Sequence, residues 1–117
     1  MSYAEFLGLA IISVTAGKVE VQAKVEKHHL NLHGSAHGGF LYSLADEAFA
    51  LASNRNGQAA VALSVHMEYF KAVREGDVIR ALVSEDHLGR RTASYRIELL
   101  RGEERVALFQ GMVYKPV

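Results

Sequence analysis

The sequence predicts an α+β fold in which about six antiparallel strands form a curved sheet wrapped around one long central helix. Three observations support this prediction. A nearly all-apolar helical segment occupies residues 39–54, strand-like segments lie on both sides of it, and short connections rich in Gly and charge join those segments. A helix that is apolar nearly all round must be covered on most of its surface, and a curved sheet provides that cover.

A short helix and two strands are predicted before the central helix. Residues 2–7 (SYAEFL) can form a short helix with Ser2 as its cap. Residues 7–14 (LGLAIISV) are predicted to form a mostly buried strand that ends in the turn TAGK. Residues 18–27 alternate strictly between polar and apolar side chains, which is typical of a half-exposed antiparallel strand.

Four further strand-like segments follow the helix and the turn sequence NRNG. They occupy residues 58–72, 76–88, 90–100 and 103–115. The breaks between them, VREGD, HLGR and RGEE, have the length of hairpin connections. Because the sequence contains no linker and no internal repeat, we expect one domain over residues 1–117.

Composition narrows the classes of function. Thirteen Lys and Arg balance thirteen Asp and Glu without a basic block, which argues against a nucleic-acid partner. The chain has no cysteine and no apolar run of the roughly 18 residues that a membrane span requires, so we expect a cytoplasmic protein without a membrane partner. A near-neutral surface weakens repulsion between copies, and we therefore expect an oligomer.

The central helical segment has a carboxylate in its middle and two glycines at its start. An Asp on a helix is ordinarily solvated or salt-bridged, but Asp46 lies among apolar residues, where a charge needs a partner or a function. Gly38 and Gly39 leave backbone N–H groups uncovered at the positive end of the helix dipole, which suits an oxyanion. The same glycines could instead serve only a tight turn or close packing.

The spacing between the glycines and the carboxylate indicates a site made by two chains. Asp46 lies about 10 Å along the helix from Gly39 and within about 20° of its face, so one helix cannot place both at a single carbonyl. A second, antiparallel copy could lay its glycine amides beside Asp46 of the first. Provided that the helices pair in this way, the site lies at a two-fold dimer interface.

The segment NLHGSAHGGFLYSLAD, from Asn31 to Asp46, closely resembles the hotdog-fold acyl-CoA thioesterases of the phenylacetate-degradation (PaaI) type. The later segments AAVALSVHMEYFKAVREGD, RRTASYRIE and VALFQG match more loosely, and the resemblance covers nearly the whole chain. It implies a hotdog fold and hydrolysis of aryl- or fatty-acyl-CoA thioesters without a metal or a cofactor. It also implies a homodimer with a continuous sheet that assembles into a homotetramer.

The resemblance further implies roles for individual residues. Asp46 is expected to be the catalytic carboxylate, acting either as a general base on water or as a nucleophile. Gly38 or Gly39 is expected to donate the amide that polarises the thioester carbonyl, from the other subunit. Asn31 and His37 match polar positions that orient the carbonyl or the water.

Six further side chains are candidates for contacts with the substrate: Ser64, Phe40, Tyr69, Lys71, Arg90 and Arg91. The serine could bond the attacking water, although a strand serine is more often structural. The two aromatic residues could line the acyl pocket, although such residues often belong to the core. The three cations could meet the phosphates of CoA, although hairpin cations are often only solvated.

The segment before the helix is rich in histidine, with four between residues 28 and 37. Imidazole is a common metal ligand, but no Cys or Asp completes a site there, and we expect no metal.

The leading hypothesis is hydrolysis of a phenylacetyl- or hydroxyphenylacetyl-CoA type of thioester. A medium-chain fatty acyl-CoA thioesterase and a non-catalytic acyl-CoA-binding hotdog protein are the alternatives, and a pure binder has no evident use for Asp46. A hotdog dehydratase is disfavoured, because its proline-bearing histidine loop and its D…H helix motif are both absent. The sequence does not rank the acyl groups, since the depth of the pocket depends on side-chain packing at the interface.

Overall fold

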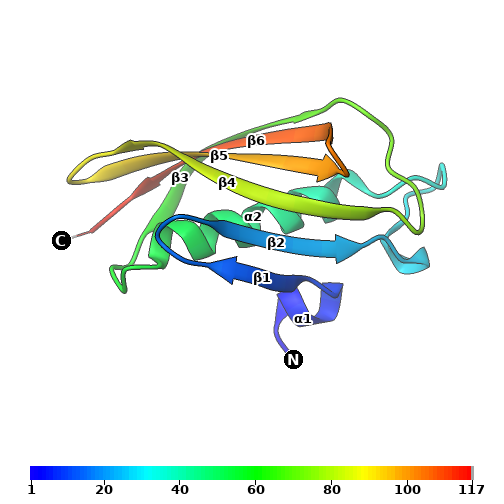
Figure 1. The fold of residues 1–117 in the computed structure, drawn as a ribbon, viewed down its shortest axis with the longest axis horizontal. Helices are drawn as coiled ribbons and strands as arrows, with labels where there is room; N and C mark the ends of the chain where they lie inside the picture. Colours follow the sequence, from blue (N-terminus) through cyan, green and yellow to red (C-terminus); the bar gives the residue numbers. More distant parts are fainter. Residues whose placement is uncertain (117) are drawn as a thin grey trace.

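The structure, a computed structural model that describes residues 1–116, confirms the predicted α+β architecture. Six strands form one antiparallel sheet in the order β1-β2-β4-β5-β6-β3, and the long helix α2 lies along its concave face (Figure 1). In chain order the elements are α1 (Tyr3–Leu7), β1 (Ala10–Val14), β2 (Val19–Lys24), the 3-10 turn η1 (Lys27–His29), α2 (Gly38–Asn54), β3 (Val61–Tyr69), β4 (Val78–Leu88), β5 (Thr92–Arg101) and β6 (Glu104–Tyr114).

The amino-terminal helix α1 begins where its cap predicts. Ser2 accepts a hydrogen bond from the backbone N–H of Glu5, and the Glu5 carboxylate accepts one from the backbone N–H of Ser2. This reciprocal pair is a capping box. The helix ends at Gly8, whose φ of 79° lies in the left-handed region that glycine adopts without strain.

The prediction that the first strand is mostly buried is wrong. Among the described residues, β1 is an edge strand that pairs with β2 alone, and Ile11 and Ile12 are 55% and 51% exposed. The reason is the position of α2, which packs mainly against β2, β4, β5 and β6 and leaves β1 beyond its reach.

The alternating strand β2 has the buried face that its pattern predicts, with Val19, Val21 and Ala23 in the core. Its polar face differs in one respect, because Glu20 is also buried. β2 is an inner strand, so Glu20 lies between neighbours, where it accepts a hydrogen bond from Arg80 Nε at 3.2 Å.

The core lies between α2 and the sheet. Phe49 of α2 packs against Phe109 of β6, with ring centroids 5.2 Å apart. Gly111 of β6 makes this approach possible, since a Cβ built on it would lie 2.7 Å from the Phe49 ring. The helix therefore sits close to the sheet at this point.

The strand β3 forms the second edge of the sheet. Within residues 1–116, this nine-residue strand pairs only with β6, with a register shift between Ala62 and Ser64, so alternate residues direct their N–H and C=O groups away from the sheet. Val61 and Leu63 are more than half exposed along it. Within residues 1–116, no helix is both long enough and apolar enough to cross a membrane.

Candidate active site

The first turn of α2 has one open backbone donor. His37 caps the helix, and its Nδ1 accepts a hydrogen bond from the N–H of Gly39 at 2.9 Å. The N–H groups of Phe40 and Leu41 both donate to the His37 carbonyl. Among the described residues, nothing accepts from the N–H of Gly38. Of the two glycine amides at the positive end of the helix, only that of Gly38 is free for another acceptor.

The same cap determines what the histidine ring can offer. Because Nδ1 of His37 accepts a hydrogen bond, a neutral ring carries its proton on Nε2. His37 is exposed, so this Nε2–H is available as a donor beside the helix start.

Asn31 is oriented by the turn that follows it. Its Oδ1 accepts from the N–H of His33 at 2.8 Å and from the N–H of Ser35 at 3.2 Å. Since the amide oxygen is engaged in this way, the NH₂ group is the part of Asn31 that can reach another molecule.

A cavity of about 310 Å³ brings several predicted residues together. Its walls come from the segment that leads into α2 and from the end of β3 with the chain that follows it. The lining residues are Asn31, Ser35, Ala36, Gly38, Leu41, Tyr69, Phe70, Lys71, Ala72 and Val73. Four residues predicted for the site therefore share one cavity: Asn31, Gly38, Tyr69 and Lys71.

Tyr69 joins the two walls of this cavity. Its hydroxyl donates to the carbonyl of Gly38 at 2.9 Å. A Cβ on Gly38 would lie 3.4 Å from the Tyr69 ring, so a larger residue would press on the ring and on the open amide. Burial, together with Tyr42 nearby, raises the pKa of Tyr69, which keeps its hydroxyl a donor at neutral pH.

Asp46 lies two turns further along α2 and does not line this cavity. It is half-buried, and the described residues offer its carboxylate neither a hydrogen bond nor an ion pair. Burial raises its pKa above the ordinary value of 3.8. Burial and the Asp46 charge also raise the pKa of Tyr42, which lies one helical turn before it. Asp46 is thus a weakly solvated carboxylate, suited to taking up a proton.

Other candidates lie elsewhere in the chain. Ser64 of β3 pairs with Met112 and lines a second cavity, on the face of the sheet that turns away from α2. Phe40 is buried and stacks on His29 with ring centroids 3.8 Å apart. Arg90 and Arg91 lie in the β4–β5 turn, at the opposite end of the molecule from the cavity that holds Asn31 (Figure 1).

Sequence reasoning missed the structural role of His29. Its Nδ1 accepts from the N–H of Glu26 at 2.9 Å, so its Nε2–H donates to the carbonyl of Leu7, also at 2.9 Å. Burial, with a smaller effect of His28, lowers the pKa of His29. The ring thereby ties α1 to the segment before α2. No local pattern signals this contact, because Leu7 is 22 residues away.

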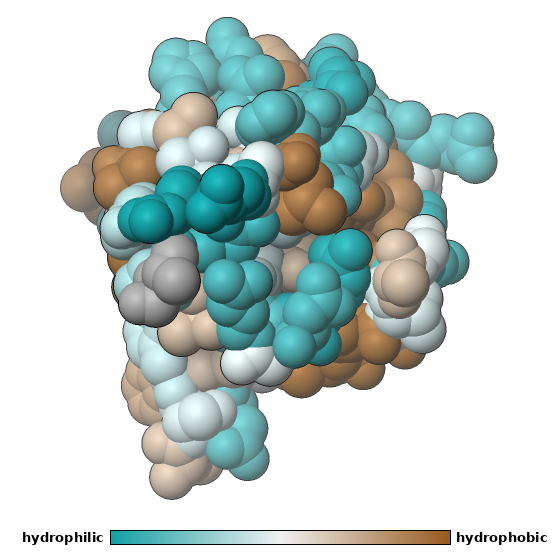
Figure 2. Space-filling view, turned by 90° about the vertical axis from the view of Figure 1, so that its left-hand side faces the viewer, coloured by the Kyte–Doolittle hydropathy of each residue, from teal (hydrophilic) through white to brown (hydrophobic). Residues whose placement is uncertain are grey.

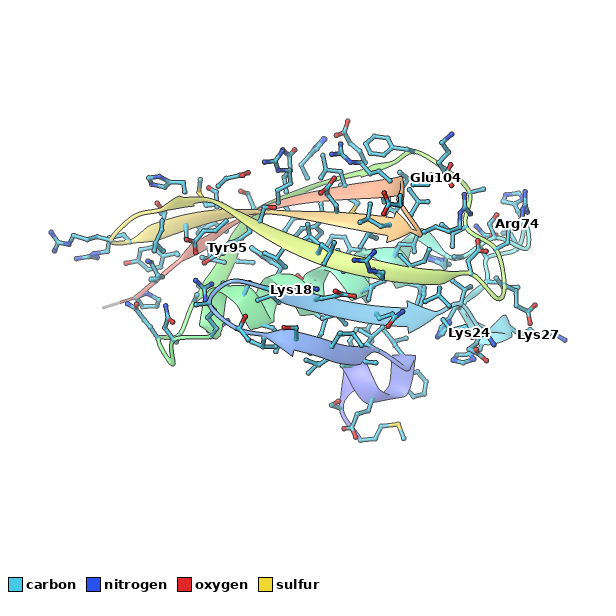
Figure 3. All side chains as sticks on the ribbon, in the orientation of Figure 1. Lys18, Lys24, Lys27, Arg74, Tyr95 and Glu104 are labelled. Atoms are coloured by element: carbon cyan, nitrogen blue, oxygen red, sulfur yellow. The ribbon has the colours of Figure 1, made fainter. Side chains whose placement is uncertain are left out.

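The far end of the molecule has a third cavity, of about 310 Å³, between the β1–β2 turn and the carboxyl end of α2. Arg55 and Glu85 form an ion pair in it at 3.6 Å, and Lys18 and Tyr95 also line it (Figure 3). Hydrophilic side chains cover much of this end of the protein (Figure 2). Residues 1–116 contain no group of three or more His, Cys, Asp or Glu arranged to hold a metal ion.

Comparison with known proteins adds the family context. Residues 33–108 of the chain match the protein family described as "Thioesterase superfamily". A putative esterase from Deinococcus radiodurans is 49% identical over 115 residues, which cover 97% of this chain and 78% of that protein. The acyl-coenzyme A thioesterase PaaI of Escherichia coli is 40% identical over 113 residues, with 96% and 81% covered. A mutant structure of the phenylacetic acid degradation protein PaaI from Thermus thermophilus superimposes with a TM-score of 0.93 at 48% identity, covering 97% of this chain and 98% of that one.

Proposed function

Because this chain belongs to the thioesterase superfamily and is an acyl-CoA thioesterase of the PaaI type, we propose that it hydrolyses aryl-acyl-CoA thioesters of the phenylacetyl or hydroxyphenylacetyl kind. The observation that carries the proposal is the open N–H of Gly38 at the start of α2. The aryl preference is supported by the similarity to phenylacetic acid degradation proteins and by the aromatic wall of Tyr69 and Phe70.

We propose that each site is shared between two subunits. Gly38 and Asp46 are eight residues apart on α2, or about 12 Å, which is too far for both to act on one carbonyl. If two α2 helices run antiparallel about a two-fold axis, the Gly38 amide of one subunit lies beside Asp46 of the other. The midpoint of the spacing is residue 42, so Tyr42 would meet the partner's Tyr42 at the axis.

The edge strand β3 supports the same dimer. Its outer edge is unpaired over nine residues, and a second β3 could pair with it antiparallel and continue the sheet through both subunits. A homotetramer would need a further surface. The exposed apolar side chains of α1 and β1 offer one: Tyr3, Phe6, Ile11, Ile12 and Val14.

The proposed reaction needs only water and the substrate. The Asp46 carboxylate takes a proton from water as the oxygen attacks the thioester carbon, and the C=O electron pair moves to the oxygen. The N–H of Gly38 donates to this oxyanion at the positive end of α2. When the oxyanion collapses, the C–S bond breaks and the CoA sulfur receives the proton held by Asp46. The products are the carboxylic acid and free CoA.

We assign roles to the neighbouring residues according to the hydrogen-bond donors and charges that they have free. Gly39 gives its N–H to His37 and serves as part of the cap, while Asn31 lines the cavity and has its NH₂ group free as a second donor for the carbonyl or the water. Lys71 lines the cavity and is the first candidate for a CoA phosphate. Arg90 and Arg91 would have to reach CoA from another subunit.

The proposal requires no cofactor, since CoA is part of the substrate, and no metal. We also propose that the enzyme acts in the cytoplasm, which suits a chain without cysteine.

Substrate class can be tested with purified protein, a thiol reagent, and phenylacetyl-, hydroxyphenylacetyl-, benzoyl- and octanoyl-CoA. We expect the highest kcat/KM for a phenylacetyl-type ester. A value about tenfold higher for octanoyl-CoA would favour the medium-chain alternative. Thiol release that survives unchanged in Asp46→Asn would contradict the role of the carboxylate.

The dimer register can be tested separately from activity. The chain has no native cysteine, so Tyr42→Cys places one thiol at the proposed axis. A disulfide requires Cα atoms about 4.4–6.8 Å apart, so this variant should form a cross-linked dimer on mild oxidation. Ala50→Cys, exposed two turns along the same helix, is the matched control and should stay uncross-linked. Equal cross-linking of both variants, or of neither, would contradict the register.

The role of Asp46 as base or nucleophile can be resolved by one turnover in ¹⁸O-labelled water with enzyme in excess. A general base leaves the label in the released acid. A nucleophile would form an anhydride, and water that opens it at the Asp46 carbonyl would leave the label in Asp46 itself.

A further inference from the structure

The guanidinium group of Arg101 contacts the connection between β3 and β4, which forms one wall of the cavity that Gly38 lines. Residues 70–77, here called the wall segment, join β3 to β4 without regular structure. Arg101, the last residue of β5, donates from Nη1 to the carbonyl of Ala72 at 3.1 Å and to Oδ2 of Asp77 at 2.9 Å. Its Nε and Nη2 both donate to Oε1 of Glu104, at 3.1 and 2.7 Å. The side chain is thus held on the β5–β6 hairpin and grips the wall segment at two points.

The Asp77 carboxylate accepts a second hydrogen bond from within the wall segment. Oδ2 of Asp77 also accepts from the backbone N–H of Arg74 at 2.9 Å. These contacts hold the pKa of the Asp77 carboxyl below its ordinary range, and the hydrogen bond from the Arg74 N–H has a larger effect than that from Arg101. Charge-assisted hydrogen bonds of this kind are stronger than neutral ones, and the fork of Arg fixes direction as well as distance. Arg74 and Glu104 lie at the same end of the molecule in Figure 3.

The wall segment in turn positions the residues that lead into α2. Val73 is buried, and its carbonyl accepts from the N–H of Ala36 at 2.7 Å. A β-bridge joins Ser35 to Arg74 beside it. The N–H of Ser35 is one of the two donors that orient Asn31, and Ala36 stands two residues before Gly38. A displacement of the wall segment would therefore move both predicted carbonyl donors.

We propose that Arg101 is a positioning residue for hydrolysis: by fixing the wall segment, it sets the places of Asn31 and Gly38 without touching the substrate. This inference rests on the proposed function, in which those two residues bind the reacting carbonyl. A misplaced donor weakens stabilisation of the transition state, so kcat should fall, whereas loss of a binding wall alone would raise KM and leave kcat unchanged.

The kinetic test uses Arg101→Met, which keeps the stem of the side chain and removes its donors. Arg105→Met is the matched control, because Arg105 makes a similar two-point contact with Glu98 on the same hairpin and none with the wall segment. With the ester that wild type hydrolyses fastest, and well below each melting temperature, we expect kcat to fall about tenfold in Arg101→Met and to stay near wild type in Arg105→Met.

Two further variants separate positioning from simple loss of stability. Arg101→Lys can still donate to one acceptor and should recover part of kcat. Asp77→Asn should lower kcat less than Arg101→Met, and the double variant should lose less than the two single losses combined, since the two side chains share one contact. A raised KM at constant kcat, additive losses, or equal kcat in Arg101→Met and Arg105→Met would overturn the proposal.

Amide hydrogen exchange tests, without any substrate, whether Arg101 holds the wall segment in place. The N–H groups of Ala36 and Arg74 both bond to the wall segment, so both should exchange faster in Arg101→Met than in Arg105→Met. If wild type hydrolyses none of the esters, the proposed function fails while faster exchange still supports the brace. If exchange at both amides is unchanged, the brace itself is refuted, whatever the activity.

Discussion

Removal of the Gly38 N–H is the sharpest test of the proposed site, and the structure offers a clean way to do it. Gly38 is the first residue of α2, where the backbone N–H has no partner inside the helix. Proline is favoured at this position, because it lacks only a donor that the helix does not use. The preceding residue, His37, has a ψ of 137°, within the range that a following proline allows. Gly38→Pro should therefore fold.

The expected size of the effect follows from the role of the amide. Removing one oxyanion donor costs about 3 kcal/mol of transition-state stabilisation, so kcat should fall roughly 100-fold or more. The fold should change little: a proline at a compatible site stabilises by about 0.4–1 kcal/mol through the unfolded chain, and the contact with Tyr69 at 3.4 Å offsets part of this gain.

The control is Gly38→Ala, which adds the same Cβ beside Tyr69 but keeps the N–H. The ratio of kcat between the alanine and proline variants isolates the amide, and thiol release under saturating substrate measures it. Thermal melts of both variants check that they are folded. If the proline variant retains kcat within about threefold of the alanine variant, the Gly38 amide is not the donor.

Subunit mixing extends this test to the two-chain site. By the proposed mechanism, Asp46→Asn and Gly38→Pro subunits should each be nearly inactive alone, whereas a mixed dimer would combine the intact Asp46 of one with the intact Gly38 of the other. After random exchange, about one quarter of all sites should be intact, and activity should return in that proportion. No recovery after verified exchange would contradict the shared site.

Three further predictions concern single side chains. Asp46→Asn should lower kcat roughly a thousandfold and raise the melting temperature at neutral pH. Burial raises the pKa of Asp46, so the kcat of wild type should begin to fall on acidification at a higher pH than an ordinary Asp would give. A pH–rate profile measures this fall. His29→Leu should destabilise the fold by about 1–3 kcal/mol in urea melts, since it leaves the Glu26 N–H without its hydrogen-bond acceptor. The lowered pKa of His29 means that the unfolded chain binds the proton more readily, so wild type should lose stability below pH 6.5 and the variant should lose less. Gly111→Ala should cost about 1–3 kcal/mol by pushing on Phe49, measured in the same melts.

Local patterns predicted the elements well where one signal was enough. The Ser2 cap marks the start of α1, and the alternation of β2 marks which side chains face the core. The long apolar helix was evident because its composition required cover on most sides. These features depend on residues that are close in the chain, and the structure confirms them.

Patterns failed where distant segments decide the environment. The apolar run around Ile11 and Ile12 was predicted to be buried, but burial depends on the order of strands, which places β1 at an edge. Glu20 is buried for the converse reason, as part of an inner strand. His29 and Arg101 act through contacts 22 and 24 or more residues away, and no motif announces them.

Within the candidate site, residue types were predictable and hydrogen-bond partners were not. The sequence could not separate Gly38 from Gly39 as the donor. The distinction comes from the His37 ring, which occupies one amide and leaves the other open. In the same way, only the turn around Asn31 shows which end of its amide is free.

The unpaired outer edge of β3 also has a consequence for how the protein is made. A strand of nine residues with open main-chain donors and acceptors is a template for pairing with extended segments nearby, including those of unfinished chains. In the proposed dimer, a newly synthesised subunit would therefore depend on rapid capture by another copy, and neutral net charge would give it little electrostatic protection meanwhile. Variants that block this edge should be lost in cells to aggregation and chaperones, and low yield rather than a soluble single subunit would be their signature.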